Sequence, residues 1–153
     1  FQDNDLFWLD WNLLEKNRDI FNYWQQIIIF RKAHPILQRE FFFTGEINQV
    51  SGIPDISWHN KRLNQPNFGH STSTLAFLLD GNSVPGKVDD SLYVMTNFSK
   101  EDVNFDLPDA VLNTSWQKII DTNYPEPYIE TPSIVGKSTK VATFSIQILI
   151  QKR

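Results

Sequence analysis

The sequence predicts a mainly β protein, in which an antiparallel β-sandwich follows an irregular segment and one long α-helix. Three observations lead to this fold class. Aromatic residues make up 14% of the 153 residues, and aromatic side chains suit pleated, half-buried surfaces. A single stripe of apolar residues at helical spacing ends at Pro35. After Pro35 the chain changes to short β-like runs separated by turn-forming residues, about one run every dozen residues.

Residues 1–18 lack a regular pattern and carry Phe7, Trp8 and Trp11 among acidic and amide side chains. A helix is predicted from Asp19, which could cap its first turn. The helix should end at His34, because the residue before a proline is pushed out of the α region. Its predicted stripe consists of Ile20, Trp24, Ile27, Ile28 and Arg31.

The predicted strands are short and are bounded by clusters of Gly, Pro, Asn, Asp and Ser. They cover residues 40–44, 56–59, 74–79, 92–98, 103–107, 116–120, 133–135 and 141–150. In the last run, the even-numbered residues from Ala142 to Ile150 should share one face, and one face of this strand should be buried. Between residues 51 and 74, only the run 56–59 interrupts a predicted long loop.

Composition excludes several classes of function. The net charge is −4 and the basic residues are scattered, so a nucleic-acid partner is not expected. The absence of cysteine excludes disulfides and thiolate metal sites and favours a cytoplasmic location. The longest apolar run, 27–30, is far shorter than the roughly 20 residues of a membrane span, so no membrane association is expected. Because the first residue is Phe1 and no secretion signal follows, we expect that the chain was cut from a longer one.

Four motifs follow one another near the start of the chain. They are Gln2-Asp3-Asn4-Asp5, Trp8-Leu9-Asp10-Trp11, Phe30-Arg31-Lys32-Ala33-His34-Pro35-Ile36-Leu37 and Phe41-Phe42-Phe43-Thr44-Gly45. This succession resembles the end of the catalytic barrel in isoamylases and glycogen debranching enzymes of the α-amylase family, which show Q-D-N-E, W-L-D-W, L-R-x-x-H-P and F-F-x-G. Asp5 stands where that family usually has Glu, and Phe30 where it usually has Leu.

The resemblance continues through most of the remaining chain. The matching segments are Asp55-Ile56-Ser57-Trp58, Leu75-Ala76-Phe77-Leu78-Leu79-Asp80-Gly81, the run from Asp89-Asp90 to Asn97, and Trp116 with Asp121-Thr122. It implies that residues 1–37 are the last loop and helix of a (β/α)₈ barrel, and that residues 38–153 form the C-terminal β-sandwich domain. It also implies a parent enzyme that hydrolyses α-1,6 linkages of glycogen or a related α-glucan. The catalytic barrel of the same polypeptide would then be a partner of this chain.

The resemblance places Gln2, Asp3 and Asn4 in a loop at the substrate cleft of the parent, where barrel enzymes build their active sites. Stabilising the loop ahead of the helix is an equally good interpretation of these residues. A retaining glycosidase needs an acid and a nucleophilic carboxylate about 5 Å apart, and in the family these lie on earlier barrel strands. Close acidic pairs such as Asp89 and Asp90 do not match those motifs, so we expect no catalytic residue in this chain and no hydrolysis by it alone.

No cofactor or metal is expected, because the spacing of His34, His59 and His70 would not gather them around an ion. An alternative function is a carbohydrate-binding β-sandwich module without hydrolase activity. Its stacking surface would use four aromatic residues, Trp58, Trp116, Tyr124 and Tyr128. Packing in a core or domain interface is the favoured interpretation of Trp58 and Trp116. Phe7, Trp8 and Trp11 would be exposed without a barrel, which predicts dimerisation. A protein-interaction sandwich is a third class, without positive sequence evidence.

Overall fold

The fold of the chain is given by a computed structural model that describes residues 3–5, 7–110, 114–126 and 128–153. The amino-terminal part contains the helices α1 (Leu13–Lys16) and α2 (Arg18–Ala33) and the 3₁₀ turn η1 (Pro35–Gln38). The strands follow, with a second 3₁₀ turn, η2 (Gly81–Ser83), between the second and third. They are β1 (Ile56–His59), β2 (Thr74–Leu79), β3 (Ser91–Asn97), β4 (Val103–Asp106), β5 (Gln117–Asp121), β6 (Tyr128–Ile134), β7 (Ser138–Val141) and β8 (Ser145–Gln151).

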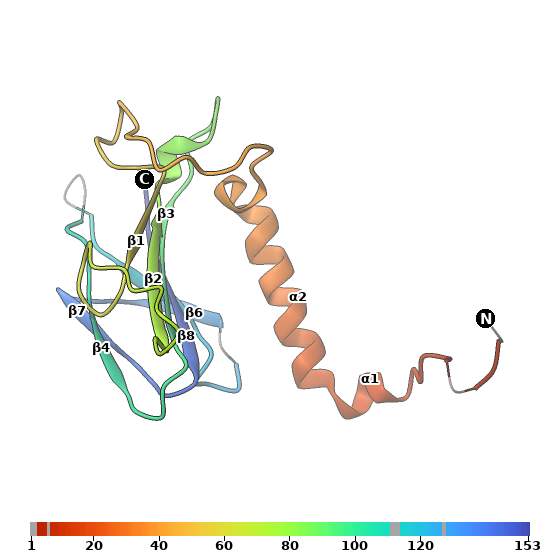
Figure 1. Cartoon of the computed structure of the whole chain (residues 1–153). Helices are drawn as coiled ribbons and strands as arrows, with labels where there is room; N and C mark the ends of the chain where they lie inside the picture. The colour runs from red at the N-terminus through yellow and green to blue at the C-terminus, as the bar shows by residue number, and fades with distance from the viewer. Residues whose placement is uncertain (1–2, 6, 111–113, 127) are drawn as a thin grey trace.

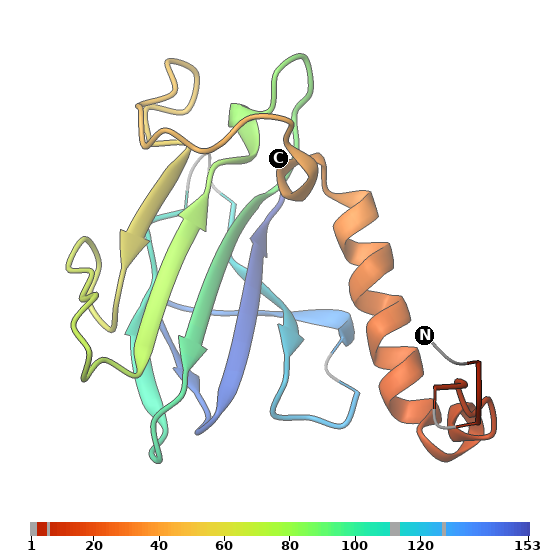
Figure 2. The ribbon, with the colours of Figure 1, turned by 45° about the vertical axis from the view of Figure 1, so that its right-hand side comes forward.

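The strands form two antiparallel sheets, which confirms the mainly β fold class. The larger sheet has six strands in the order β1-β2-β3-β8-β5-β6, and β4 pairs with β7 in a separate two-stranded sheet. Figure 1 shows β4 and β7 on one side of the larger sheet and α2 on the other. In Figure 2 the helix runs along the sheet and leads through η1 to the end of the sheet where the chain also terminates.

The sandwich interior is one apolar core between the two sheets. Strand residues alternate between faces, so Ala76 and Leu78 of β2 point inward together with Tyr93 and Met95 of β3. The small sheet supplies Phe105 from the opposite side. Burial of about ten such side chains is the main stabilising contribution of this domain, at roughly 25 cal/mol per Å² of apolar surface.

A second core lies on the outer face of the six-stranded sheet, beneath the helix. Leu79, Leu92 and Ile150 form a row across β2, β3 and β8. Phe30 of α2 and Ile36 of η1 pack onto this row and are almost fully buried. The helix is therefore fixed to the β domain by its last turn.

The predicted helix is confirmed, with two corrections. Its N-cap is Asn17, so Asp19 lies in the first turn and does not cap it. The helix ends at Ala33 with His34 as C-cap, as the following proline requires. The buried side is centred on Phe30 with Ile27 beside it, whereas Ile20, Trp24 and Ile28 of the predicted stripe are exposed. The helix carries apolar side chains on every side, so their spacing in the sequence did not identify the side that packs on the sheet.

Three strand predictions need correction. Residues 40–44 form no strand, because β propensity without a neighbouring strand leaves the backbone groups unpaired. Residues 141–150 are divided between β7 and β8 by a turn in which Phe144 has a φ of 49°. The run predicted at 133–135 is the end of the longer strand β6, which begins at Tyr128 and stops at Ile134. Within the described residues, no helix is long and apolar enough to span a bilayer.

Candidate functional site

The predicted substrate residues lie in the irregular segment ahead of α1. Gln2 lies outside the described residues. The exposed carboxylate of Asp3 accepts a hydrogen bond from the indole Nε1 of Trp8. The carbonyl of Asn4 accepts one from the backbone N–H of Phe7 at 3.0 Å. These contacts form a local turn, and a role of the three residues in substrate binding stays a prediction.

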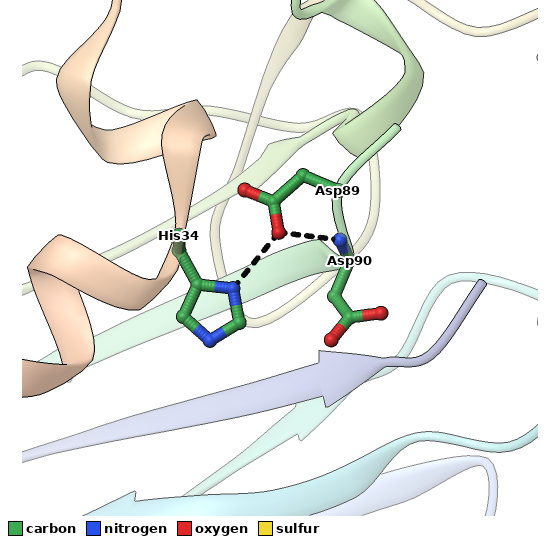
Figure 3. Close-up of side chains that lie close together, drawn as sticks. All are labelled: His34, Asp89 and Asp90. Atoms are coloured by element: carbon green, nitrogen blue, oxygen red, sulfur yellow. Dashed lines mark hydrogen bonds and ion pairs between the residues drawn. The ribbon is translucent and has the colours of Figure 1, made fainter. Parts of the chain in front are cut away.

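The most tightly organised polar cluster joins the end of α2 to the start of β3. His34 Nδ1 lies 2.9 Å from Asp89 Oδ1, and both side chains are buried. Asp89 Oδ1 also accepts the backbone N–H of Asp90 at 2.7 Å, and Asp89 Oδ2 accepts the backbone N–H of Ile36 at 2.8 Å. Figure 3 shows the imidazole reaching from the helix end to the Asp89 carboxylate, which also holds the Asp90 backbone. One carboxylate therefore fixes the C-terminal end of α2, η1 and the approach to β3.

This cluster has the composition of a small metal site, since His34, Asp89 and Asp90 offer ligand atoms within 4.8 Å of one another. The hydrogen bonds argue for a structural role. A carboxylate oxygen can only accept, so His34 Nδ1 carries the proton, and the lone pair of the neutral imidazole lies on Nε2, the ring nitrogen that does not contact Asp89. Both oxygens of Asp89 already accept backbone or imidazole donors. Asp90 Oδ1 accepts the backbone N–H of Arg153 at 3.0 Å.

The same contacts bear on catalysis by this acidic pair. A general acid and a nucleophile must both face the glycosidic bond. Asp89 is buried and directed at the helix end, and Asp90 holds the backbone of the last residue. Asp89 and Asp90 therefore make contacts within the protein and do not face a common substrate position.

Two buried arginine pairs support the neighbouring loops. Arg39 Nη1 donates to Asp55 Oδ2 at 3.0 Å, and its guanidinium lies 4.2 Å from the centroid of the Phe43 ring. Burial would raise the pKa of Asp55, but the N–H groups of Thr44 and Gly45 and the charge of Arg39 outweigh it, and the pKa lies below its ordinary value. This pair fixes the segment that was wrongly predicted as a strand.

The second pair joins the C-terminal residue to the β2–β3 connection. Arg153 Nη2 donates to Asp80 Oδ1 at 2.9 Å and to Ser91 Oγ at 2.8 Å. Both side chains of the pair are buried. Sequence inspection did not identify either arginine, because partners separated by 16 and 73 residues leave no local pattern.

Large apolar side chains are exposed on the side of α2 that faces away from the sheet. Trp24 is 58% exposed, whereas Phe30 is 5% exposed. Phe21 and Ile28 lie beside Trp24 at helical spacing and are also exposed. Phe7, Trp8 and Trp11 of the preceding segment extend this exposed set. We call these six residues the apolar helix surface.

The four aromatic residues of the alternative sugar-binding interpretation do not share one surface. Trp116 is buried in the sandwich core, where its Nε1 donates to the carbonyl of Pro108 at 2.8 Å. Trp58 is 40% exposed on the edge strand β1. Tyr124 and Tyr128 belong to the β5–β6 hairpin, at the opposite edge of the sheet. Trp58 therefore remains a candidate for ligand contact, and Trp116 does not.

One known protein family matches the part of the chain that forms most of the sandwich. Residues 57–144, more than half of the chain, match the family described as isoamylase, C-terminal. The chain belongs to this isoamylase C-terminal family. The resemblance inferred from the motifs is thereby confirmed.

Curated relatives of this isoamylase C-terminal chain include a glycogen operon protein homologue and an isoamylase. A "Glycogen operon protein GlgX homolog" of Mycobacterium bovis is 28% identical over 160 residues, covering 97% of this chain and 22% of that protein. An isoamylase of Pseudomonas amyloderamosa is 26% identical over 124 residues, covering 78% of this chain and 15% of the relative. The chain thus spans about a fifth of the length of the relatives that it matches.

Solved structures with the same fold include pullulanases. The pullulanase type I of Bacillus subtilis, solved in complex with maltose, aligns with a TM-score of 0.63 and 20% identity, over 95% of this chain and 17% of that one. A pullulanase from Bacillus acidopullulyticus gives the same TM-score and identity over 93% of this chain and 15% of that one. At this identity the likeness establishes the fold.

Proposed function

We propose that this chain is the non-catalytic C-terminal part of a glycoside hydrolase that cleaves α-1,6 branch linkages of glycogen or a related α-glucan with retention of configuration. The family membership and the names of the relatives support a debranching enzyme. The cytoplasm is the expected location, since the chain contains no cysteine.

The two-sided packing of α2 carries the proposal. One side of the helix is buried on the β-sheet through Phe30, while Trp24 and Ile28 are exposed on the other. Contiguous exposed apolar surface of this kind marks an interaction site. The catalytic barrel of the same polypeptide is the proposed partner, so α2 would be held between the barrel and the sandwich.

This arrangement refines the proposed domain boundary. Residues 1–37 are assigned to the end of the barrel and residues 38–153 to the β domain. Phe30 and Ile36 nevertheless pack into the core beneath the sheet. The boundary at residue 37 is therefore a division of the sequence only, because the residues before it pack against the β domain that follows it.

In the parent, Gln2, Asp3 and Asn4 would lie in the last strand-to-helix loop of the barrel and contact sugar hydroxyls. The catalytic carboxylates would come from the preceding barrel strands, because retaining chemistry needs a facing pair about 5 Å apart. The contribution of this chain is then to cover the barrel and to support its last helix.

The test uses a longer polypeptide that contains this chain behind a catalytic barrel. Replacing both Trp24 and Ile28 by Ser should lower its melting temperature and its debranching rate on glycogen, because the contact with the barrel would lose apolar area. Phe144→Ser is the matched control, since Phe144 is an exposed aromatic residue in the β7–β8 turn. Equal melting temperatures and rates for all three proteins would refute the docking of α2 on the barrel.

A second candidate function is a carbohydrate-binding module without hydrolase activity, favoured by the exposed indole of Trp58. The two functions differ in one observable. A longer polypeptide that binds maltooligosaccharides but never releases reducing ends from glycogen would support the module.

Self-association is a separate expectation for the isolated chain. The apolar helix surface would then be covered by a second copy. Sedimentation velocity should show a concentration-dependent dimer that is weakened by Trp24→Ser.

A further inference from the structure

The loop of residues 60–73 joins β1 to β2 and stands out at the edge of the sheet farthest from α2 (Figures 1 and 2). Contacts with the sandwich hold the loop in place. Leu63 packs against the sandwich core, and the backbone N–H of Asn64 donates to His59 Nδ1 at 2.8 Å. The Thr74 hydroxyl donates to Asn60 Oδ1, which ties the two ends of the loop together. A long loop with such anchors is preorganised for binding.

Two adjoining hollows open on this loop. One, of about 350 Å³, is bordered mainly by polar residues from Asn60 to Thr74, and the other, of about 330 Å³, lies over the start of β2 and the end of β3. The two share Asn67, Thr72, Ser73 and Thr74. Together they offer space of the size found in small-molecule sites.

Seven of the nine residues that line the first hollow are uncharged and polar; the other two are Lys61 and Arg62, and Arg62 is paired with Asp106 at 3.3 Å. Among the described residues, the Gln65 amide and the hydroxyls of Ser71, Thr72 and Ser73 have no hydrogen-bond partner. Asn67 Oδ1 accepts the N–H of Gly69 at 2.9 Å, which leaves its Nδ2 group to donate. Amides and hydroxyls both donate and accept, which suits the hydroxyl groups of a neutral polyhydroxy ligand.

Aromatic side chains border the second hollow. Phe68 and Phe98 are exposed there, Phe68 by 70%. The Trp58 ring packs edge-on to Phe68, with the centroids 5.9 Å apart. Aromatic rings beside hydroxyl and amide groups provide an apolar face and a polar rim, the two surfaces that a pyranose ring presents.

We propose that loop 60–73, with Trp58, Phe68 and Phe98, forms a binding site for a neutral α-glucan chain. The ligand class rests on the proposed debranching function, whereas the site itself rests on the loop. In a longer polypeptide the site would hold a branch of the polysaccharide apart from the catalytic centre, on a part of the chain that contributes no catalytic carboxylate.

Calorimetric titration of this chain with maltoheptaose tests the proposal. Saturable heat is expected at concentrations up to about 10 mM, the range of weak sugar sites. Phe68→Ala should weaken binding about tenfold through lost stacking. Thr72→Val, which keeps the side-chain shape and removes the hydroxyl, should weaken it several-fold. Phe42→Ala is the control, because Phe42 is exposed in a different segment.

Absence of saturable heat would overturn the site, as would unchanged binding in both loop variants with circular dichroism like that of the unsubstituted chain. Equal binding of cellohexaose would overturn the α-glucan assignment. These outcomes are separable from failure of the proposed function. Debranching by a longer polypeptide without maltoheptaose binding at the loop would refute only the loop site, and binding without debranching would refute only the hydrolase.

Discussion

His34 at the C-cap of α2 donates from Nδ1 to the buried carboxylate of Asp89, 55 residues later in the chain, at 2.9 Å. The same carboxylate accepts the backbone N–H of Ile36. The orientation of the helix on the sandwich is thus determined by one side chain from the segment that leads to β3. The Asp89 carboxylate makes three hydrogen bonds, with His34, Ile36 and Asp90, so its removal should loosen both the end of α2 and the start of β3.

Asp89→Asn is expected to lower the free energy of unfolding by about 1–3 kcal/mol, because one oxygen is replaced by an amide donor that faces other donors. Urea denaturation provides the measurement. Asp109→Asn is the matched control, since Asp109 is exposed. A loss no larger than that of the control would show that the carboxylate does not hold the junction.

Gly81 lies against the backbone of Asp89 and Asp90, the residues that lead into β3. A Cβ at this position would stand 2.0 Å from the carbonyl oxygen of Asp89, so the backbone must move to admit any side chain. Gly81→Ala should cost about 1–3 kcal/mol of unfolding free energy and lower the melting temperature. Gly136→Ala should be nearly neutral, because a Cβ at Gly136 would meet nothing within 4 Å. Similar melting temperatures for the two variants would contradict the close approach.

The anchor of loop 60–73 predicts a pH dependence of stability. Burial lowers the pKa of His59 below 6.5, and its Nδ1 accepts the N–H of Asn64 only when neutral. Below pH 6.5 the unfolded chain takes up this proton more readily than the folded chain, so the unfolding free energy should fall as the pH is lowered from 6.5, by at most about 1.4 kcal/mol per pH unit. Above pH 6.5 the contribution of His59 should be constant.

Urea denaturation at several pH values checks this slope. His59→Gln should reduce the slope below pH 6.5, and His70→Gln, at an exposed position, is the control that should leave the slope unchanged. The same slope in all three proteins would assign the pH dependence to other groups.

The two sides of α2 should respond differently to substitution in the isolated chain. Phe30→Ala removes a ring from the core beneath the sheet and should cost about 3–5 kcal/mol. Trp24→Ser, on the exposed side, should change the unfolding free energy by less than about 0.5 kcal/mol. Both measurements are made at protein concentrations where the chain is monomeric, and a similar loss of stability in the two variants would then show that the exposed side of the helix has a partner within the chain itself.

Much of this fold was predictable because local signals agreed with tertiary packing. The bounds of β2 follow from an apolar run between turn formers, and the end of α2 follows from the position of Pro35. The run 40–44 failed because its aromatic residues have β propensity but no strand partner. The division of 141–150 also escaped prediction, because the turn at Phe144 contains neither Gly nor Pro.

The polar contacts were the least predictable part. His34–Asp89 and Arg153–Asp80 join residues that are 55 and 73 positions apart, and their geometry exists only after the sheet has formed. The motif containing His34 could be recognised, but its partner could not. Buried Gln147 is another example, since its amide donates to Asp121 and to a β7 carbonyl from a strand predicted by its apolar residues.

Release of reducing ends from glycogen is the most direct test of the central claim, that this chain supports a debranching hydrolase without performing the chemistry. The purified chain alone should release none, and a longer polypeptide that carries it behind a catalytic barrel should release them together with linear α-glucan chains. Reducing ends released by the isolated chain, in amounts proportional to its concentration, would contradict the account.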